Sequence, residues 1–286
     1  MHSITGQAEY IGIQEFIENR CGIALGNEKS YVLESKVKEL LHEKTNAGLA
    51  ELHYRVCILQ DTKSISQLIE AITINETFWF RDKLPWQLFD AVLMPKYTAA
   101  LRSKEKLRIR IWSAASSTGQ EPYSIAMCIK AYLSRNAISD IMPQNFEIVA
   151  SDIDQSVLRY AEKGEYDSIA MSRGLAESQK DAFFIQENRI WRIRDEVKAM
   201  VRFQPFNLIK DAYSYGQYDT IFCRNVLIYF SEKMKKTVYQ QLSHSLLPNG
   251  VLFIGGSELL DDDERRFKRI PYEEGVYFQK NDVNQK

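Results

Sequence analysis

The segment W-S-A-A-S-S-T-G-Q-E-P-Y-S, residues 112–124, decides the fold of this chain. It follows an alternating apolar run at 107–112, which predicts a β-strand, and its small residues with Gly119 predict a tight loop. Pro122 suits the first position of a helix, where its missing N–H costs nothing. A strand, a small-residue loop and a helix N-terminus form the usual cradle for a nucleoside-type cofactor, so the segment predicts an α/β enzyme.

The chain after about residue 81 continues this α/β pattern. Further strands are predicted at 146–151, 218–223 and 251–255, and helices at 83–100, 122–134, 155–163 and 232–247, the last stopped by Pro248-Asn249-Gly250. Alternating strands and helices predict a mostly parallel sheet covered on both faces. Two segments depart from the alternation. We interpret 183–203 as a small antiparallel β insertion, and 267–270 with 275–279 as a terminal hairpin around Pro271.

Residues 1–72 differ from the rest because their apolar residues recur at helical spacing. Helices are predicted at 10–20, 28–44, 49–59 and 65–72, with Gly22 and Gly26 as breaks after the first. The sequence therefore predicts a small all-α domain over residues 1–72, followed by an α/β domain over residues 73–286.

Composition limits the classes of function. The 286 residues carry a formal net charge of −1, and the pI of about 6.5 does not favour general binding to nucleic acid or to a membrane surface. The four cysteines form no C-x-x-C pair and the four histidines show no metal-ligand spacing, so we expect reduced thiols and no metal site. The chain has no apolar run long enough to span a membrane and no signal-peptide pattern, so we expect a soluble, cytoplasmic protein.

Candidate site residues follow the predicted strands, at the edge where open α/β sheets bind ligands. Glu121 follows the first strand, and Asp152 follows the second, where an acidic residue is placed to take two ribose hydroxyls. Each of these residues taken alone also has a structural explanation. Asp152 could be a helix cap, Asn207 could be a turn residue, and Arg224 could be half of a surface ion pair. As a group they indicate a site, because all of them fall at one edge of one sheet.

Two further stretches carry residues of the same kind. Residues 75–81 hold Asn75, Thr77 and Arg81, which are harder to explain as packing than the aromatic residues between them. Gly255-Gly256-Ser257-Glu258 follows the strand at 251–255.

Taken in order, these motifs resemble those of the chemotaxis receptor methyltransferases, the CheR family. The matching motifs are N-x-T-x-F-F-R at 75–81, W-S-A-A-x-S-T-G-E-E-P-Y-S at 112–124, A-S-D-I-D at 150–154, N-L at 207–208 and C-R-N-V-x-I-Y-F at 223–230. The resemblance covers nearly the whole chain. It implies a class I methyltransferase fold, Rossmann-like with a C-terminal antiparallel strand. It also implies methyl transfer from S-adenosylmethionine to receptor glutamates in sensory adaptation, with S-adenosylhomocysteine as product.

The resemblance also implies roles for individual residues. The cofactor pocket would be lined by Asn75, Thr77, Arg81, Glu121, Asp152, Asn207, Leu208, Arg224 and Asn225. Asp152 would hold the ribose, in preference to Asp154 because it lies nearer the strand end, and the Asn207-Leu208 pair would meet the adenine. Arg81 and Tyr229 would face the reacting methyl group and help to place the acceptor.

The expected partner is the cytoplasmic helical region of methyl-accepting chemotaxis receptors. Lys29, Lys36, Lys38 and Lys44 share one predicted helix and would steer an acidic partner, although a solvated amphipathic helix is the alternative. Trp79 and Gln120 replace a Phe and a Glu of the family pattern. The insertion is compact between Gln186 and Arg192 and lacks the Gly-containing lengthening of members that dock on a receptor's C-terminal pentapeptide, which disfavours that docking mode.

Three other functions compete with this interpretation. A class I methyltransferase for a small molecule or nucleic acid is disfavoured by the low net charge, the full motif set and the absence of an N-P-P-Y-like segment near Arg224. A non-enzymatic module that binds S-adenosylmethionine is disfavoured by the intact Arg81 and Tyr229. A nicotinamide dehydrogenase would need three glycines in the first loop, where only Gly119 is present.

Overall fold

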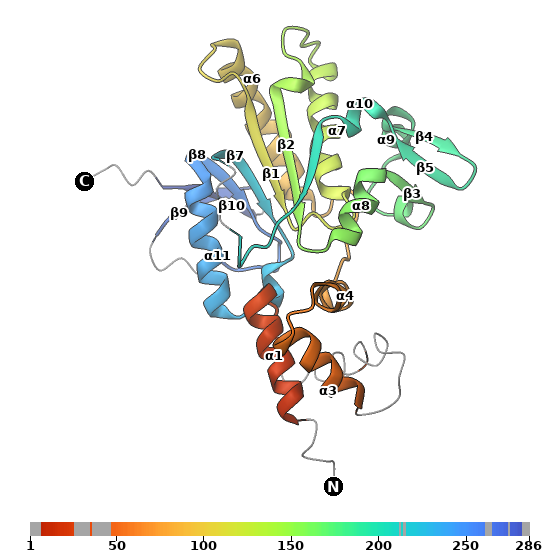
Figure 1. The fold of residues 1–286 in the computed structure, drawn as a ribbon. Coiled ribbons are helices and arrows are strands. Elements are labelled where there is room, and N and C mark those ends of the chain that lie inside the picture. Colours follow the sequence, from red (N-terminus) through yellow and green to blue (C-terminus); the bar gives the residue numbers. More distant parts are fainter. Residues whose placement is uncertain are drawn as a thin grey trace.

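The computed structural model describes residues 7–25, 35, 47–211, 213, 216–260, 265–273 and 275–281. Its main sheet has seven strands in the order β6-β2-β1-β7-β8-β10-β9 (Figure 1). The strands from β6 to β8 pair in parallel, whereas β10 runs antiparallel to both β8 and β9. This confirms the predicted mostly parallel sheet with an antiparallel C-terminal end. The strands are β1 (Ile109–Ala114), β2 (Phe146–Asp152), β6 (Val201–Pro205), β7 (Tyr218–Cys223), β8 (Leu246–Phe253), β9 (Phe267–Tyr272) and β10 (Gly275–Lys280).

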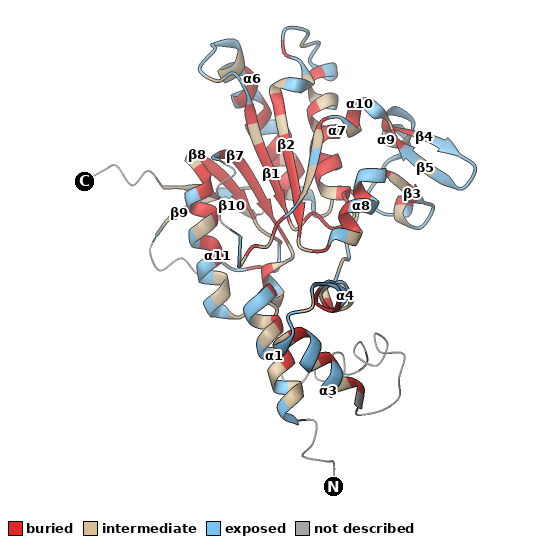
Figure 2. Ribbon diagram, viewed as in Figure 1, coloured by how far each residue is buried: buried red, intermediate tan, exposed pale blue. Residues whose placement is uncertain are grey.

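The central strands are mostly buried because both faces of the sheet are covered by helices (Figure 2). Successive residues point to opposite faces, so Ile111 packs into one apolar core and Trp112 into the other. Helices α6 (Met94–Arg102) and α7 (Gln120–Arg135) contribute to the first core, and α11 (Glu232–Ser245) to the second. Helix α8 (Gln155–Lys163) follows β2 and contacts both β2 and β6.

The N-terminal helices lie beyond the carboxyl ends of the parallel strands (Figure 1). They are α1 (Gln7–Cys21), α3 (Ala47–His53), the π-helical turn η2 (Tyr54–Ile58) and α4 (Thr62–Ile72), and they share a small apolar core. The chain after α1 touches the main domain, where the Ala24 N–H donates to the Tyr229 carbonyl at 2.8 Å. The predicted helix at 28–44, with Lys29, Lys36, Lys38 and Lys44, lies outside the described residues.

The antiparallel insertion is present but ends earlier than we expected. Its sheet has the order β3-β5-β4, formed by β3 (Glu165–Asp167), β4 (Phe184–Glu187) and β5 (Ile190–Ile193), with α9 (Glu177–Phe183) leading into β4. The run at 199–203, which we assigned to the insertion, instead forms β6 and pairs in parallel with β2. As an edge strand, β6 keeps several exposed residues, and this mixed pattern made it look like part of a surface hairpin.

Smaller differences concern helix and strand boundaries. The predicted helix at 83–100 runs as α5 (Lys83–Leu88), the π-helical turn η3 (Phe89–Leu93) and α6. Helix α7 begins at Gln120, so Pro122 is its third residue and not its first. Pro122 still lies in the first turn, where N–H groups have no partner within the helix. Pro248-Asn249-Gly250 forms an irregularity within β8, and Pro271 lies within β9. Four short helical elements complete the set: η4 (Pro143–Asn145), η5 (Ala170–Ser172), α10 (Asp195–Lys198) and η6 (Leu227–Tyr229).

No helix within the described ranges is long and apolar enough to cross a membrane.

Candidate functional site

A cavity of about 950 Å³, measured to its open mouth, lies at the carboxyl ends of β1, β2 and β7. Its walls come from the loops after these strands and after β6, from the linker between α4 and α5 (residues 73–82), from Trp86 of α5, and from Cys21 and Ile23 at the end of α1 and just beyond it. All ten residues named from the sequence border it, namely Asn75, Thr77, Arg81, Glu121, Asp152, Asn207, Leu208, Arg224, Asn225 and Tyr229. The fold therefore brings the whole predicted set together around one cavity.

The loop after β1 folds over the end of β2 and is held there by Asp152. The Ser117 N–H donates to Asp152 Oδ2 at 2.8 Å, and the Asp154 N–H donates to Asp152 Oδ1 at 3.0 Å. Burial raises the pKa of Asp152 to about 6, although these backbone hydrogen bonds oppose the rise. Gly119 ends the loop at φ +92°, and a Cβ there would lie 2.8 Å from Ala161 Cβ, so both conformation and space require glycine.

Asp154 has a different task from Asp152. It caps α8 by accepting from the Ser156 N–H at 2.8 Å, and it accepts from Asn75 Nδ2 at 3.0 Å. Burial alone would raise the pKa of Asp154, but the hydrogen bonds from Ser156 and Asn75 lower it overall. Asp154 is not among the residues that line the cavity, whereas Asp152 is. The Asn75 side-chain amide is therefore already engaged in holding the linker against α8. The main-chain carbonyl of Asn75 accepts from Ser117 Oγ at 2.8 Å.

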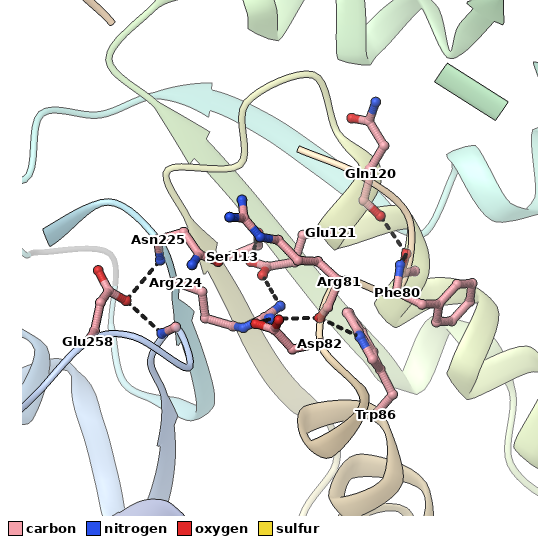
Figure 3. A network of polar contacts seen from close by, with 12 residues as sticks. Phe80, Arg81, Asp82, Trp86, Ser113, Gln120, Glu121, Arg224, Asn225 and Glu258 are labelled. Carbon is pink, nitrogen blue, oxygen red and sulfur yellow. Dashed lines mark hydrogen bonds and ion pairs between the residues drawn. The ribbon is translucent and has the colours of Figure 1, made fainter. Parts of the chain in front are cut away.

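Arg224 lies at the centre of a buried ion-pair network on the opposite wall (Figure 3). Its side chain is 1% exposed, and Nη1 donates to Glu121 Oε2 at 2.9 Å while Nη2 donates to Asp82 Oδ2 at 2.7 Å. Burial raises the pKa of Glu121, and the charge of Arg224 and the hydroxyl of Ser113 oppose the rise. Arg224 is thus a buried organiser of the wall and not half of a surface ion pair.

The same network fixes the backbone of Arg81. Its carbonyl accepts from Arg224 Nη2 at 2.6 Å and from Trp86 Nε1 at 3.0 Å (Figure 3). The neighbours Phe80 and Asp82 both have positive φ, +48° and +59°, a conformation that persists only where surrounding contacts enforce it. The Arg81 side chain reaches the cavity from this fixed point, and its Nη1 donates to the Glu76 carbonyl at 3.1 Å.

Glu258 is a residue whose role the sequence did not reveal. Its buried carboxylate accepts from four backbone N–H groups, those of Gly255, Asn225, Leu227 and Ile228, at 2.6 to 3.2 Å. Asn225 has φ +59°, so the chain turns sharply there, and Figure 3 shows Glu258 beside it. Glu258 therefore holds the loop that carries Asn225 and Tyr229. The sequence feature that could have pointed to Glu258 is its position after a parallel strand, at the same edge of the sheet as the other site residues.

Asn207 and Leu208 follow β6, and Tyr229 follows β7. The Asn207 side chain accepts from the Ile209 N–H at 2.9 Å and donates to the Arg20 carbonyl at 2.7 Å, so it is also the turn residue that the sequence allowed. Leu208 is buried. Tyr229 lies at the end of η6, where burial raises its pKa and the charge of Arg81 opposes the rise.

Two buried polar atoms on the cavity wall lack a protein partner among the described residues. They are Ser116 Oγ and Arg224 Nε. Buried polar groups are nearly always hydrogen-bonded, so an unpartnered donor and hydroxyl in a cavity wall fit a polar ligand. With the Asp152 carboxylate at the end of β2, the donors and acceptors present fit a cofactor that has ribose hydroxyls and charged groups.

Comparison with known proteins gives a family match. A family model described as CheR methyltransferase, SAM binding domain, matches residues 75–276. This range includes every residue of the cavity wall except Cys21, Ile23, Thr73 and Ile74.

Relatives match over nearly their full length. A protein named "Chemotaxis protein methyltransferase Cher2" from Pseudomonas putida is 34% identical, covering 96% of this chain and 98% of the relative. A "Chemotaxis protein methyltransferase" from Vibrio parahaemolyticus is 38% identical, covering 94% and 96%. A protein of the same name from Listeria monocytogenes is 30% identical, covering 88% and 90%.

Proposed function

This chain belongs to the CheR methyltransferase family, and we propose that it methylates glutamate side chains of methyl-accepting chemoreceptors. The family match assigns S-adenosylmethionine as cofactor, with S-adenosylhomocysteine as the product. The observation that carries the proposal is the gathering of ten motif residues from five separate stretches of the chain around one cavity. We further propose residues 1–72 as the receptor-facing helical domain and 73–286 as the methyltransferase domain, acting on the cytoplasmic helices of the receptor.

The residues proposed to bind the cofactor contact different parts of it. Asp152 would accept the ribose hydroxyls, and Asn207 and Leu208 would border the adenine. Asn75, Thr77, Glu121, Arg224 and Asn225 would complete the pocket. Because Asp154 is engaged by Ser156 and Asn75, its contacts support the choice of Asp152.

The chemistry requires orientation more than proton transfer. Bound S-adenosylmethionine supplies an activated methyl group, and a glutamate acceptor is ionised at neutral pH because its unperturbed pKa is about 4.3. The protein then has to hold the carboxylate in line and exclude competing water. Arg81 presents a planar guanidinium that can pair with a carboxylate, and Tyr229 offers a weaker hydroxyl donor. No residue is needed as a general base.

Two variants test this division of roles. Arg81→Ala and Tyr229→Phe should each lower kcat, because each removes an orienting donor, and the dissociation constant for S-adenosylhomocysteine should change less for Tyr229→Phe. Initial-rate methylation assays with both variants measure kcat. Full turnover in both would show that neither residue orients the acceptor.

The product bond tests the function itself. Receptor-containing membranes from the source organism are incubated with methyl-labelled S-adenosylmethionine and the protein, then treated with mild base. The proposal expects label on a receptor band that leaves as methanol, which identifies a carboxyl ester. Label that resists base would indicate an amine or nucleic-acid base as the acceptor and would contradict the proposal.

A further inference from the structure

We propose that Arg173, together with Phe78, forms an acceptor-recognition surface at the mouth of the cavity. It would bind a second carboxylate of the substrate, so that the protein selects a glutamate within an acidic helical segment. The inference rests on the proposed function and deepens it by naming the feature of the substrate that is recognised. Arg173 belongs to none of the motifs that identified the family and lies in the chain between β3 and α9.

The backbone beside Arg173 is fixed against the linker. A Cβ on Gly174 would lie 1.7 Å from the Trp79 carbonyl oxygen, and Gly174 has φ +90°, so no other residue fits there. The Trp79 indole N–H donates to the Ala170 carbonyl at 3.0 Å, and Trp79 is fully buried. These contacts hold Arg173 next to the stretch that carries Phe78 and Arg81.

Two guanidinium groups share the aromatic ring of Phe78. The Cζ atoms of Arg173 and Arg81 lie 4.2 Å and 5.3 Å from the ring centroid. These distances add up to 9.5 Å, which is therefore the greatest separation of the two charges. Phe78 lines the cavity. The second positive charge thus lies no more than 9.5 Å from the charge of the residue proposed to orient the acceptor.

This upper limit on the separation is compatible with the spacing of carboxylates one turn apart along a helix. An α-helix rises about 1.5 Å per residue, so carboxylates four and seven residues apart lie about 6 Å and 10 Å apart along the axis. An acceptor glutamate at Arg81 would therefore place an acidic residue one or two turns away near Arg173. Charge complementarity of this kind fixes the register of a charged partner and raises its rate of association.

Arg173 is available for such a contact. Its side chain is 58% exposed, and one of its donors contacts Glu76 Oε1 at 3.2 Å. The Glu76 side chain is 65% exposed, and an exposed ion pair of this kind contributes little stability. A substrate carboxylate can therefore compete with Glu76, and the negative charge of Glu76 itself opposes an acidic partner. The other possible role of Arg173 is to hold the linker by its pair with Glu76.

Two substitutions separate recognition from this purely structural role. Arg173→Ala removes the positive charge, and Glu76→Gln removes the competing negative charge while keeping the size of the side chain. Recognition predicts opposite effects on the KM for a soluble fragment of the receptor's methylation helices. A structural ion pair predicts effects in the same direction, because both variants break it.

We expect Arg173→Ala to raise this KM about threefold to tenfold with kcat little changed, and Glu76→Gln to lower this KM. The dissociation constant for S-adenosylhomocysteine should stay at the wild-type value in Arg173→Ala, because Arg173 does not line the cavity. The increase for Arg173→Ala should shrink as ionic strength rises, since the contact is exposed. Arg102→Ala is the matched control, because Arg102 is 50% exposed, pairs with Asp140 and does not border the cavity.

Binding of the same fragment, followed by fluorescence anisotropy in the presence of S-adenosylhomocysteine, is measured alongside. If wild type forms base-labile ester but KM shifts in the same direction in both variants, or in neither, the inference is wrong and the proposed function stands. If wild type binds the fragment without methylating it, the variants' affinities decide the inference alone. If wild type neither binds nor methylates any receptor of its source, the proposed function fails and the inference fails with it.

Discussion

The two ends of β7 both hold buried charged groups, yet only one of them borders a cavity. At the amino end, the Asp219 carboxylate accepts from the Arg110 N–H at 2.8 Å and pairs with Lys106 at 2.6 Å. At the carboxyl end, Arg224 pairs with Glu121 and Asp82. In both places a charge taken out of water is compensated by opposite charge and hydrogen bonds, as its burial requires.

The difference between the two ends lies in what remains unpartnered. Arg224 keeps a buried Nε without a partner in the described part of the chain, and both Arg224 and Ser116 line the cavity. The Asp219 pair lies away from the cavity. Burial of a charge therefore does not mark a functional site by itself. A buried charge at the carboxyl ends of the strands that lacks one of its hydrogen-bond partners does mark such a site.

Breaking the carboxyl-end pair should have the largest effect. Arg224→Met leaves Glu121 buried without its counter-charge, so we expect a loss of about 3 kcal/mol or more in the free energy of unfolding. Methyl transfer should fall by at least about a hundredfold, because the Arg81 carbonyl also loses one of its two donors. Chemical denaturation and initial rates measure the two effects. Lys106→Met, at the amino end, is the control and should keep its turnover.

The next largest effect compares two buried carboxylates. Glu258→Gln and Asp219→Asn each exchange a buried acceptor for an amide, and each should cost about 1–3 kcal/mol of unfolding free energy. Only Glu258→Gln should lower kcat per folded molecule, by about tenfold or more, because the loop with Asn225 and Tyr229 loses acceptors for its N–H groups. Equal kcat values in the two variants would show that Glu258 serves stability alone.

The smallest effect is a pH dependence that distinguishes Asp152 from Asp154. The pKa of Asp152 is raised to about 6, so it gains a proton as the pH falls through 6 and can no longer accept two ribose hydroxyls. The dissociation constant for S-adenosylhomocysteine should then rise by up to about tenfold per pH unit below 6. The pKa of Asp154 is lowered, so Asp154 stays ionised in this range. Calorimetric titrations that give a flat profile from pH 7 to pH 5 would rule out Asp152 as the ligand.

Topology alone accounts for part of the predicted set lying together. Glu121, Asp152 and Arg224 follow parallel strands, and the carboxyl ends of such strands meet at one edge whatever the details of packing. No distance had to be known for this conclusion. The linker residues Asn75 and Arg81 were named from their motif, and the structure brings them to the same cavity.

The residue whose role the sequence did not reveal acts through the backbone. Glu258 accepts from four main-chain N–H groups. Backbone partners leave no pattern of residue types, so such contacts cannot be read from a sequence. The strand β6 was misassigned for a related reason, because an exposed edge strand and a surface hairpin share one alternating pattern.

A crystal structure of the complex with S-adenosylhomocysteine would show where the cofactor binds. We expect the ligand in the cavity between the loop after β1 and the loop from Arg224 to Tyr229, with its ribose hydroxyls on Asp152. We also expect new partners for Ser116 Oγ and Arg224 Nε. A ligand bound elsewhere, or a ribose held by Asp154 with both of these atoms still unpartnered, would contradict the proposed cofactor site.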